Sequence, residues 1–580
     1  MRDPYDAIVI GGGHNGLTSA AYLARAGWRV LVLERRHVLG GAAVTEEIVP
    51  GFRFSVASYV VSLLRPEVIR DLDLPRHGLE ILPLDGTFTP LLEGAAAAAG
   101  VAGPDYLWRV NDHGRTVREL RRWSKLDAEA YEEYGRLMVQ MARFIKPILS
   151  IVPPDPTGLD PRPFLPLAGV ARAFGRLPEA QQAVFIQLMT MSSADFLDQW
   201  FETDPLKATM AASGIIGTFQ GIRSPGTAYV LLHHYMGEID GAFRTWGIPK
   251  GGTGGISEAI ASAARGFGAE IRTEAPVARI LERGGRATGV ALESGEEIEA
   301  RHVFSSVDAR RTFLDLVEAG SLDEDFVADV RRIRYRGSSG KVNLAVDALP
   351  DFRSLPGPGE HLCGAISISP GTEWMERAYD DAKYGHFSRR PYMDMVIPTL
   401  VDPTMAPPGK HVISCFVQYA PYELAPELGG WDAQREAFGD TVVDTIAEFA
   451  PNIRDIVVGR QVLTPLDLER QMGLSEGNIF QGELSLEQLF FSRPVPGYAR
   501  FRTPIERLWL CGSAAHPGGG IMGAPGRLAA IEALTADRTG GRGRMRSRNR
   551  LRPQLAARTD ARSALAARQA TASELGGRRA

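Results

Sequence analysis

Cysteine is scarce in this chain of 580 residues, which contains only Cys363, Cys415 and Cys511. No two of them lie close together in the sequence, so there is neither a C-x-x-C redox pair nor the ligand spacing of a zinc site. The scarcity argues against a dithiol reductase, and we expect no metal site. It also favours a reducing compartment, because disulfides are rare in such compartments.

Long apolar runs and a strong excess of one charge are also missing. No stretch is apolar over the roughly 20 residues that a membrane-spanning helix needs, and the first residues lead into a strand rather than a signal peptide. We therefore expect a cytoplasmic protein, with contact to a membrane surface as an open alternative. The formal net charge of −4 argues against a general nucleic-acid-binding function.

The chain opens with the pattern of a dinucleotide-binding unit. An apolar strand over 7–10 is followed by the turn Gly11-Gly12-Gly13-His14-Asn15-Gly16, a helix over 17–26 and a second apolar strand over 28–33. The turn fits G-x-G-x-x-G, a motif that is weak evidence by itself. Here strand, glycines, helix and second strand follow one another in the required order, so we interpret the segment as a cofactor site.

Four residues of this unit have separate functions in binding the cofactor. Gly11 allows the tight turn, Gly13 lets the pyrophosphate approach the backbone, and Gly16 lets helix and strand pack closely. Glu34 ends the second strand, about where an acid binds a ribose hydroxyl. The helix N-terminus offers N–H groups and a partial positive charge to the phosphates. The motif does not choose between NAD and FAD.

A second dense glycine segment lies at 251–255. No clear strand precedes it, so we interpret it as packing within the cofactor domain rather than as a site for NAD(P). Without a nicotinamide site, we expect the electron acceptor to be oxygen, a quinone or another carrier.

Most of the remaining chain is predicted to be mixed α/β structure. A helix is expected over 124–151 with Ser124 as its N-cap, and residues 178–201 form a second, very apolar helical region. Its side chains indicate either a core face, which we favour, or the lining of a site for an apolar substrate. Residues 311–494 alternate strands with helices and have the texture of an α+β substrate domain.

The end of the chain has a different composition. From residue 537 onward there are twelve arginines and three acidic residues, with few apolar ones. Such a segment cannot bury enough apolar surface to order itself, so we predict a disordered basic tail.

Three separate segments resemble the FAD-dependent phytoene desaturase-like flavoproteins, which are relatives of the amine oxidases. They are 8–41, 248–308 and 508–530, and the most specific part is His516-Pro517-Gly518-Gly519-Gly520 with Gly523-Ala524-Pro525-Gly526. The resemblance implies an α/β fold in which a discontinuous Rossmann-type FAD-binding domain is combined with an α+β substrate domain. The implied FAD-binding domain comprises 1–75, 245–310 and 495–537; the substrate domain comprises 76–244 and 311–494; the disordered tail is 538–580.

The resemblance also implies further residues of the FAD site. It adds Gly41, from a glycine pair that follows the acid, and Val277, whose backbone would meet the adenine. From the last segment it adds Gly512, Ser513, Gly519, Gly520, Met522 and Gly523, where a helix N-terminus would face the flavin ring. Many such flavoproteins carry Gly-Asp where this chain has Gly512-Ser513, so that hydrogen bond is either lost or made by the serine.

The function implied by the resemblance is dehydrogenation, or isomerisation, of a small lipophilic substrate such as a polyene or lipid, by hydride transfer to flavin. His516 is the single candidate for a catalytic polar group, and the alternative is that its ring only hydrogen-bonds the glycine loop. Two other functions stay open: a flavin amine oxidase, and a flavin-bound scaffold with little catalysis. The sequence does not indicate an oligomeric state.

Overall fold

A computed structural model describes residues 4–154, 164–239, 242–243 and 246–538. The chain divides into a large unit, Met1–Ala533, and a C-terminal unit, Leu534–Ala580. Apart from residue 538, the segment predicted to be a disordered tail lies outside the described residues. The fold of the large unit is a Rossmann-type sheet combined with a second, mostly antiparallel sheet and a group of helices, so the predicted α/β fold class is confirmed.

The first sheet is built around two apolar strands from the start of the chain. Its order is β11 (Glu270–Arg272), β2 (Val30–Leu33), β1 (Tyr5–Ile10), β14 (Glu297–Ser305), β13 (Ala287–Leu292) and β12 (Val277–Glu282), with β20 (Leu508–Leu510) also paired to β14. β1 is parallel to β2 and β14, and β20 is parallel to β14. Residues 7–9 and 30–32 are fully buried, as expected for parallel strands covered on both faces.

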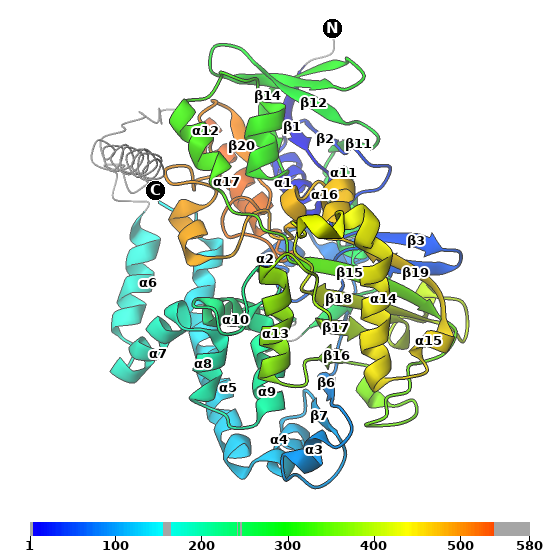
Figure 1. Cartoon of the computed structure of the whole chain (residues 1–580). Helices are drawn as coiled ribbons and strands as arrows, with labels where there is room; N and C mark the ends of the chain where they lie inside the picture. The colour runs from blue at the N-terminus through cyan, green and yellow to red at the C-terminus, as the bar shows by residue number, and fades with distance from the viewer. Residues whose placement is uncertain (1–3, 155–163, 240–241, 244–245, 539–580) are drawn as a thin grey trace, which may run out of the picture. The chain divides into compact units, whose positions relative to one another are not determined.

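Three helices from distant parts of the chain pack on this sheet (Figure 1). They are α1 (His14–Arg25), α11 (Gly254–Gly266) and α17 (Ala524–Arg538). At Gly526 the last of them approaches α1 so closely that an added Cβ would lie 2.0 Å from the Asn15 carbonyl oxygen. The Ser19 hydroxyl donates a hydrogen bond of 2.9 Å to the Gly526 carbonyl oxygen. Glycine is therefore required at position 526 to join the two ends of the fold.

The second sheet lies beside the first and is almost entirely antiparallel. Its order is β19 (Val457–Leu463), β15 (Ser339–Val346), β18 (His411–Gln418), β17 (Tyr392–Val396), β16 (Ala365–Ile368), β6 (Thr87–Pro90) and β7 (Tyr106–Arg109). Only β16 and β6 pair in parallel. All eight residues of β15 are buried, and α14 (Trp431–Phe449) lies across one face of the sheet (Figure 1).

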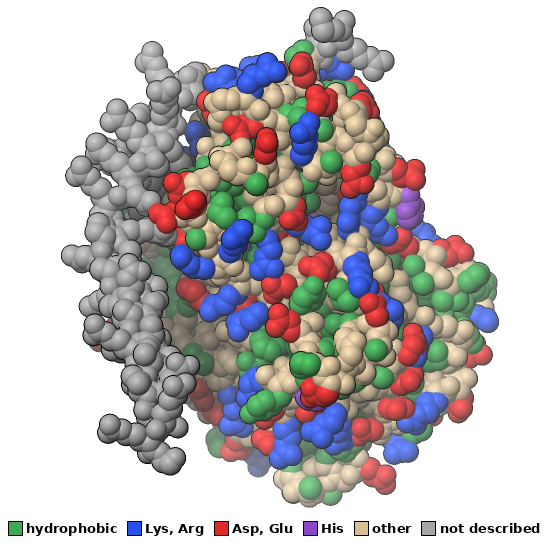
Figure 2. Space-filling view, turned by 45° about the horizontal axis from the view of Figure 1, so that its top comes forward, with side chains coloured by type: hydrophobic (Ala, Val, Ile, Leu, Met, Phe, Trp, Pro, Cys, Tyr) green, Lys and Arg blue, Asp and Glu red, His purple; other side chains and the backbone are tan. Residues whose placement is uncertain are grey.

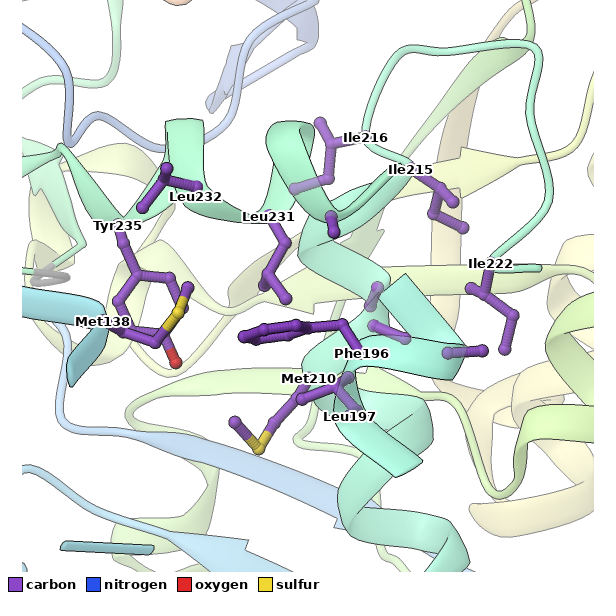
Figure 3. Packing of buried hydrophobic residues seen from close by; sticks show 14 of the residues in the cluster. Met138, Phe196, Leu197, Met210, Ile215, Ile216, Ile222, Leu231, Leu232 and Tyr235 are labelled. Atoms are coloured by element: carbon purple, nitrogen blue, oxygen red, sulfur yellow. The ribbon is translucent and has the colours of Figure 1, made fainter. Parts of the chain in front are cut away.

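A group of helices flanks the second sheet and encloses its own apolar core (Figure 3). It includes α5 (Lys125–Ile145), α7 (Glu179–Thr190), α8 (Ser193–Asp198) and α10 (Thr227–Tyr235). Ser124 caps α5 as predicted, because its hydroxyl accepts a hydrogen bond from the Asp127 N–H. Figure 3 shows Phe196 and Leu197 pointing into this core, toward Leu231 of α10. Much of the apolar region 178–201 therefore serves packing.

The structure divides the region 178–201 into two helices rather than one. The break falls at Met191, where the backbone is extended, and Ser192 then caps α8 by accepting a hydrogen bond from the Asp195 N–H. A serine with an acid three residues later is a start signal for a helix, and it lies inside the apolar run that suggested a continuous one.

Shorter elements connect these layers. The remaining helices are α2 (Pro66–Asp71), α3 (Ala95–Ala98), α4 (His113–Trp123), α6 (Leu165–Gly175), α9 (Asp204–Ala211), α12 (Glu324–Arg331), α13 (Thr372–Lys383), α15 (Ile453–Ile456) and α16 (Pro465–Met472). The remaining strands form pairs: β3 (Thr45–Val49) with β4 (Phe52–Ser55), β5 (Ile81–Pro83) with β10 (Gly247–Pro249), and β8 (Glu238–Ile239) with β9 (Ala242–Phe243). Among the described residues, no helix is both long and apolar enough to cross a bilayer.

Candidate cofactor and substrate site

The glycine turn after β1 leaves open space in front of the first helix. Gly11 has a φ of +93°, and Gly13 is the N-cap of α1. The Leu17 N–H donates to the Gly13 carbonyl oxygen, so the N–H groups before it have no acceptor within the helix. A Cβ added to Gly13 would meet no atom closer than 3.9 Å, whereas one added to Gly16 would lie 2.2 Å from the Gly11 carbonyl oxygen. The turn thus combines a tightly packed glycine with an open one, as a phosphate site requires.

Glu34 is buried at the end of β2 and is held rigidly. One carboxylate oxygen accepts a hydrogen bond of 2.7 Å from the Gly12 N–H, and the other accepts one of 2.9 Å from the Arg36 N–H. The Gly40 N–H donates to the Gly12 carbonyl oxygen at 2.9 Å, and a Cβ added to Gly41 would lie 3.4 Å from the Gly13 Cα. Acid, turn and glycine pair therefore meet at one point.

Val277 begins the strand β12, beside the end of β2. The chain that leads to it is bonded along β2, because the Ala275 N–H donates to the Glu34 carbonyl oxygen at 2.9 Å and the Glu274 N–H donates to that of Arg36 at 3.0 Å. This path brings Val277 close to the acid, where the adenine of a dinucleotide is expected. Its contact with adenine stays a prediction.

The loop between β20 and α17 contacts the start of α1. The Asn15 side-chain amide donates a hydrogen bond of 3.0 Å to the Ser513 hydroxyl, and a Cβ added to Gly512 would lie 2.3 Å from the Ser306 carbonyl oxygen. Met522 is buried and accepts a hydrogen bond from the Arg65 N–H at its carbonyl oxygen. Gly523, with a φ of +68°, immediately precedes α17.

Gly519 and Gly520 are needed for packing within the protein itself. A Cβ added to Gly519 would lie 2.6 Å from the Phe480 ring, and one added to Gly520 would lie 2.7 Å from Leu63. The sequence suggested that these glycines spare room for the flavin ring. In the structure the side-chain directions are filled by neighbouring residues, so it is their backbone that is left to face a ligand.

A cavity of about 120 Å³ lies where this loop, the start of α1 and the second sheet meet. Its wall includes His14, Ser58, Tyr59, Trp246, Lys341, Phe416, Ser513 and Gly520. Of the predicted site residues, Ser513 and Gly520 are therefore brought together at the cavity. Gly11, Gly13, Gly16, Glu34, Gly41 and Val277 belong to the neighbouring dinucleotide site.

Lys341 is the ionisable residue of the second sheet at this cavity. It lies on β15 and is 2% exposed. Its ammonium group donates to the Asn343 side-chain oxygen at 3.0 Å and to the Ser414 hydroxyl, and its Nζ lies 5.6 Å from the centre of the Tyr59 ring. Burial lowers the pKa of Lys341 to about 7. Near neutral pH this lysine can therefore both give and take a proton.

Two aromatic rings form one side of the cavity. Tyr59 and Phe416 are stacked with ring centres 5.6 Å apart and planes at 12°. The Tyr59 hydroxyl lies 3.4 Å from an Asp394 carboxylate oxygen, to which the Tyr392 hydroxyl donates at 2.7 Å. Burial raises the pKa of Asp394. The pair is therefore a fixed wall, since a planar group between two rings needs about 7 Å, twice the contact distance of carbon atoms.

His516 is buried beside the cavity wall but is not among the residues that line it. Its Nε2 lies 2.9 Å from the Ile148 carbonyl oxygen, and its ring meets that of Phe490 edge-on at 5.1 Å. Burial lowers the pKa of His516 to about 4, so the ring is neutral at physiological pH. The hydrogen bond goes to the segment after α5 rather than to the glycine loop. A catalytic function for His516 stays a prediction without a contact that supports it.

Sequence reasoning missed Lys341 and the aromatic pair, although a signal for the lysine exists. Ser339, Lys341 and Asn343 alternate with Gly340, Val342 and Leu344 in a strand that is otherwise apolar. A period of two places the three polar side chains on one face. A polar face on a wholly buried strand indicates a lined cavity.

FAD fits the groups around the dinucleotide site and the cavity. Three buried side-chain atoms there have no hydrogen-bond partner among the described residues: His14 Nε2, Asn15 Oδ1 and Ser62 Oγ. The first α-helical turn adds backbone N–H groups, and Glu34 offers oxygens to a ribose. A dinucleotide site that continues into a closed, mostly apolar cavity defines a class of protein, the oxidoreductases that hold a redox ring in such a cavity.

Family comparisons agree with this class and refine it. The model of the NAD(P)-binding Rossmann-like domain matches residues 9–72, and that of the flavin containing amine oxidoreductases matches residues 166–524. The chain belongs to the flavin-containing amine oxidoreductase family. It is an FAD-dependent oxidoreductase, which confirms the predicted cofactor and enzyme class and leaves the scaffold alternative without support.

Individual relatives cover nearly the whole chain. Pyridine nucleotide-disulfide oxidoreductase domain-containing protein 2 of Rattus norvegicus is 43% identical over 91% of this chain and 93% of its own length. One component of the limonene dehydrogenase of Castellaniella defragrans is 27% identical (89% and 92%), and a phytoene desaturase (lycopene-forming) of Pantoea ananas is 26% identical (91% and 98%). The resemblance to phytoene desaturase-like flavoproteins is thus confirmed. An oxidoreductase structure from Methanosarcina mazei shares the fold, with a TM-score of 0.58, 19% identity and coverage of 91% and 99%.

Proposed function

We propose that this enzyme dehydrogenates, or isomerises, a lipophilic substrate held in the cavity beside Lys341. The observation that carries the proposal is the composition of the wall, which is mostly apolar and includes no aspartate or glutamate among the described residues. An apolar substrate loses no hydrogen bonds on entering such a site. A protonated amine would find no carboxylate there and would meet the positive form of Lys341.

FAD, when bound, supplies the acceptor for a hydride from the substrate. The chain itself must then position the C–H bond and take up the proton that leaves with the second hydrogen. The stacked Tyr59 and Phe416 provide a flat, rigid surface for the first task. Neutral Lys341 provides a base for the second, since its pKa lies at about 7 and general bases work best near the ambient pH.

The relatives support a substrate of this kind. One is named as part of a limonene dehydrogenase and another as a phytoene desaturase, and both names describe hydrocarbon substrates. The family name describes amine oxidation instead. The aromatic pair favours the hydrocarbon alternative, because its rings are too close together to hold an amine between them.

The experiment is an anaerobic survey of flavin reduction in the purified holoenzyme. Terpenes, polyenes and fatty acyl compounds are compared with primary amines and polyamines by the loss of the flavin's visible absorbance. Reduction by at least one apolar compound, with no reduction by the amines, is the expected result. Reduction by amines alone would overturn the proposal and establish the amine-oxidase alternative.

We further propose that oxygen or a quinone reoxidises the flavin. The second glycine segment serves packing in the structure: the Gly254 N–H donates to the Thr45 hydroxyl at 2.9 Å and the Thr253 N–H to the Ser55 hydroxyl at 3.0 Å. It therefore offers little to a nicotinamide dinucleotide. Stopped-flow mixing of reduced enzyme with oxygen, a soluble quinone or NAD⁺ separates these acceptors, and rapid reoxidation by NAD⁺ would contradict the proposal.

Contact with a membrane surface stays a hypothesis. On α6 and α7, Leu165 and Ile186 are the two large apolar side chains that are exposed among the described residues. On the face drawn in Figure 2, basic and acidic side chains are interspersed and apolar ones are scattered. Flotation of the enzyme with liposomes of neutral and anionic lipid tests the hypothesis, and recovery only in the dense fraction would exclude it.

A further inference from the structure

Arg493 is a buried cation that the proposed reaction does not use. Its side chain is 2% exposed, and its guanidinium donates hydrogen bonds to five backbone carbonyl oxygens. The acceptors are Phe480 (2.6 Å), Ser513 (2.8 Å from one nitrogen and 3.0 Å from another), Gly482 (3.2 Å), Glu483 (3.3 Å) and Gln488 (3.4 Å).

No carboxylate compensates this charge within the part of the chain that the structure describes. The Glu483 carboxylate, although close in sequence to the acceptors, is bonded to Arg336 at 2.6 Å and also pairs with Arg334. Burial lowers the pKa of Arg493 only to about 10, so the guanidinium stays charged at physiological pH. A buried charge with neutral partners is costly, which makes its retention informative.

The titratable side chains that face Arg493 are neutral as well. On α10, burial raises the pKa of Tyr229 to about 12 and lowers that of His233 to about 3. Burial also raises the pKa of Tyr335, and it lowers that of His516 to about 4. In both histidines the positive charge of Arg493 lowers the pKa further. Among these described neighbours the guanidinium is therefore the one charged group, and it acts on groups several ångströms away.

The charge lies directly behind the wall of the cavity. The Ser513 carbonyl oxygen accepts two of its hydrogen bonds, and the same residue lines the cavity. A Cβ added to Gly518 would lie 3.6 Å from the Arg493 Nε. The loop that separates the guanidinium from the cavity consists of backbone and small residues at this point, so little polarisable material screens the charge.

We propose that Arg493 is a positioning residue that also supplies the fixed positive charge behind the flavin ring, and that it raises the reduction potential of the bound FAD. The inference depends on FAD but not on the identity of the substrate. Oxidised flavin takes up two electrons and one proton to give a reduced ring with one negative charge, or a second proton to give a neutral ring. A nearby uncompensated cation favours the anionic form, and stabilising the product of reduction raises the potential.

The first experiment measures the flavin potential of the wild-type holoenzyme as a function of pH. We expect the potential to fall by the amount for one proton per two electrons, from mildly acidic to mildly alkaline pH. A slope for two protons per two electrons over that whole range would show that the reduced flavin is neutral and would overturn the proposal. This measurement needs no variant to fold.

The second experiment compares the variants Arg493→Gln and Arg493→Lys. In the glutamine variant we expect a lower potential and a slope that approaches two protons per two electrons, while the lysine variant keeps the wild-type slope. Both variants lose carbonyl contacts, so both melt at lower temperature, and only the loss of charge separates them. A glutamine variant with bound FAD and the wild-type potential would reduce Arg493 to a structural residue.

The matched control is Arg500→Gln in the same segment. Arg500 pairs with Glu532 at 3.0 Å, and Arg502 pairs with the same carboxylate at 3.1 Å. Because its charge is compensated, we expect the potential and its pH slope to stay at the wild-type values. An equal fall in potential in this variant would show that net charge, and not the buried guanidinium, sets the potential.

Discussion

The dinucleotide site and the cavity differ in how the sequence encodes them. The dinucleotide site is built mainly from one continuous stretch, residues 10–41, whose turn, helix and acid are in contact through local hydrogen bonds. The cavity draws its wall from α1, the loop after β20, α10 and the second sheet, which are hundreds of residues apart. A local site leaves a motif in the sequence, whereas an assembled site leaves only isolated residues.

The largest expected effect separates the two regions completely. In Gly13→Val, the added side chain occupies space that is open in the protein, since no atom lies within 3.9 Å of the Cβ position. The variant should fold with little change in melting temperature but bind no FAD, because the side chain takes the place of the pyrophosphate. Absorbance of the purified protein and circular dichroism measure the two properties.

The control for this variant is Gly135→Val, in α5. No atom lies within 4 Å of its Cβ position either, so the substitution is sterically matched but far from the turn in sequence. We expect a full complement of FAD. A Gly13→Val protein that folds and keeps its flavin would show that the pyrophosphate lies elsewhere.

Particular residues show how far prediction from sequence reaches. Gly11, Gly16 and Glu34 lie where the motif requires, because a parallel strand, a tight turn and a helix are local structures that short-range sterics determine. The two-helix break at Met191 was missed, since an apolar run conceals a cap. Lys341 was missed because its partners, Ser414 and Tyr59, come from other parts of the chain, and sequence spacing carries no information about such contacts.

The next largest effect concerns the assembled region. In Lys341→Met, the flavin should stay bound, while the rate of flavin reduction by substrate falls by about 10²–10⁴-fold, the usual contribution of a general base. In the wild type the rate should rise with pH and level off above a pKa of about 7, because burial lowers the lysine's pKa and only the neutral amine accepts a proton. The variant should lose this titration.

Lys250→Met controls for the loss of a lysine. Its ammonium pairs with Glu80 on the surface at 2.9 Å, so we expect the wild-type rate and pH profile. If Lys341→Met also reduces its flavin at the wild-type rate over the whole pH range, another group accepts the proton.

A smaller effect is expected where the chain's two ends meet. Gly526→Ala would place a Cβ 2.0 Å from the Asn15 carbonyl oxygen, so α17 must move away from α1. Overpacking of this kind costs about 1–3 kcal/mol, which urea unfolding followed by circular dichroism can measure. Gly169→Ala in α6, where no atom lies within 4 Å, should be neutral or stabilising. Equal stability of the two variants would contradict the close approach of the helices.

The smallest effect belongs to the hydrogen bond that joins the local site to the assembled one. The Asn15 side chain is buried and donates to the Ser513 hydroxyl at 3.0 Å, so it couples the start of α1 to the cavity loop. Asn15→Ala, Ser513→Ala and the double variant form a cycle in which FAD affinity is measured by fluorescence. A neutral hydrogen bond contributes about 1 kcal/mol, and we expect a coupling of that size. Strictly additive effects would show that the two regions bind the cofactor independently, and the contrast between them would then extend from sequence to energetics.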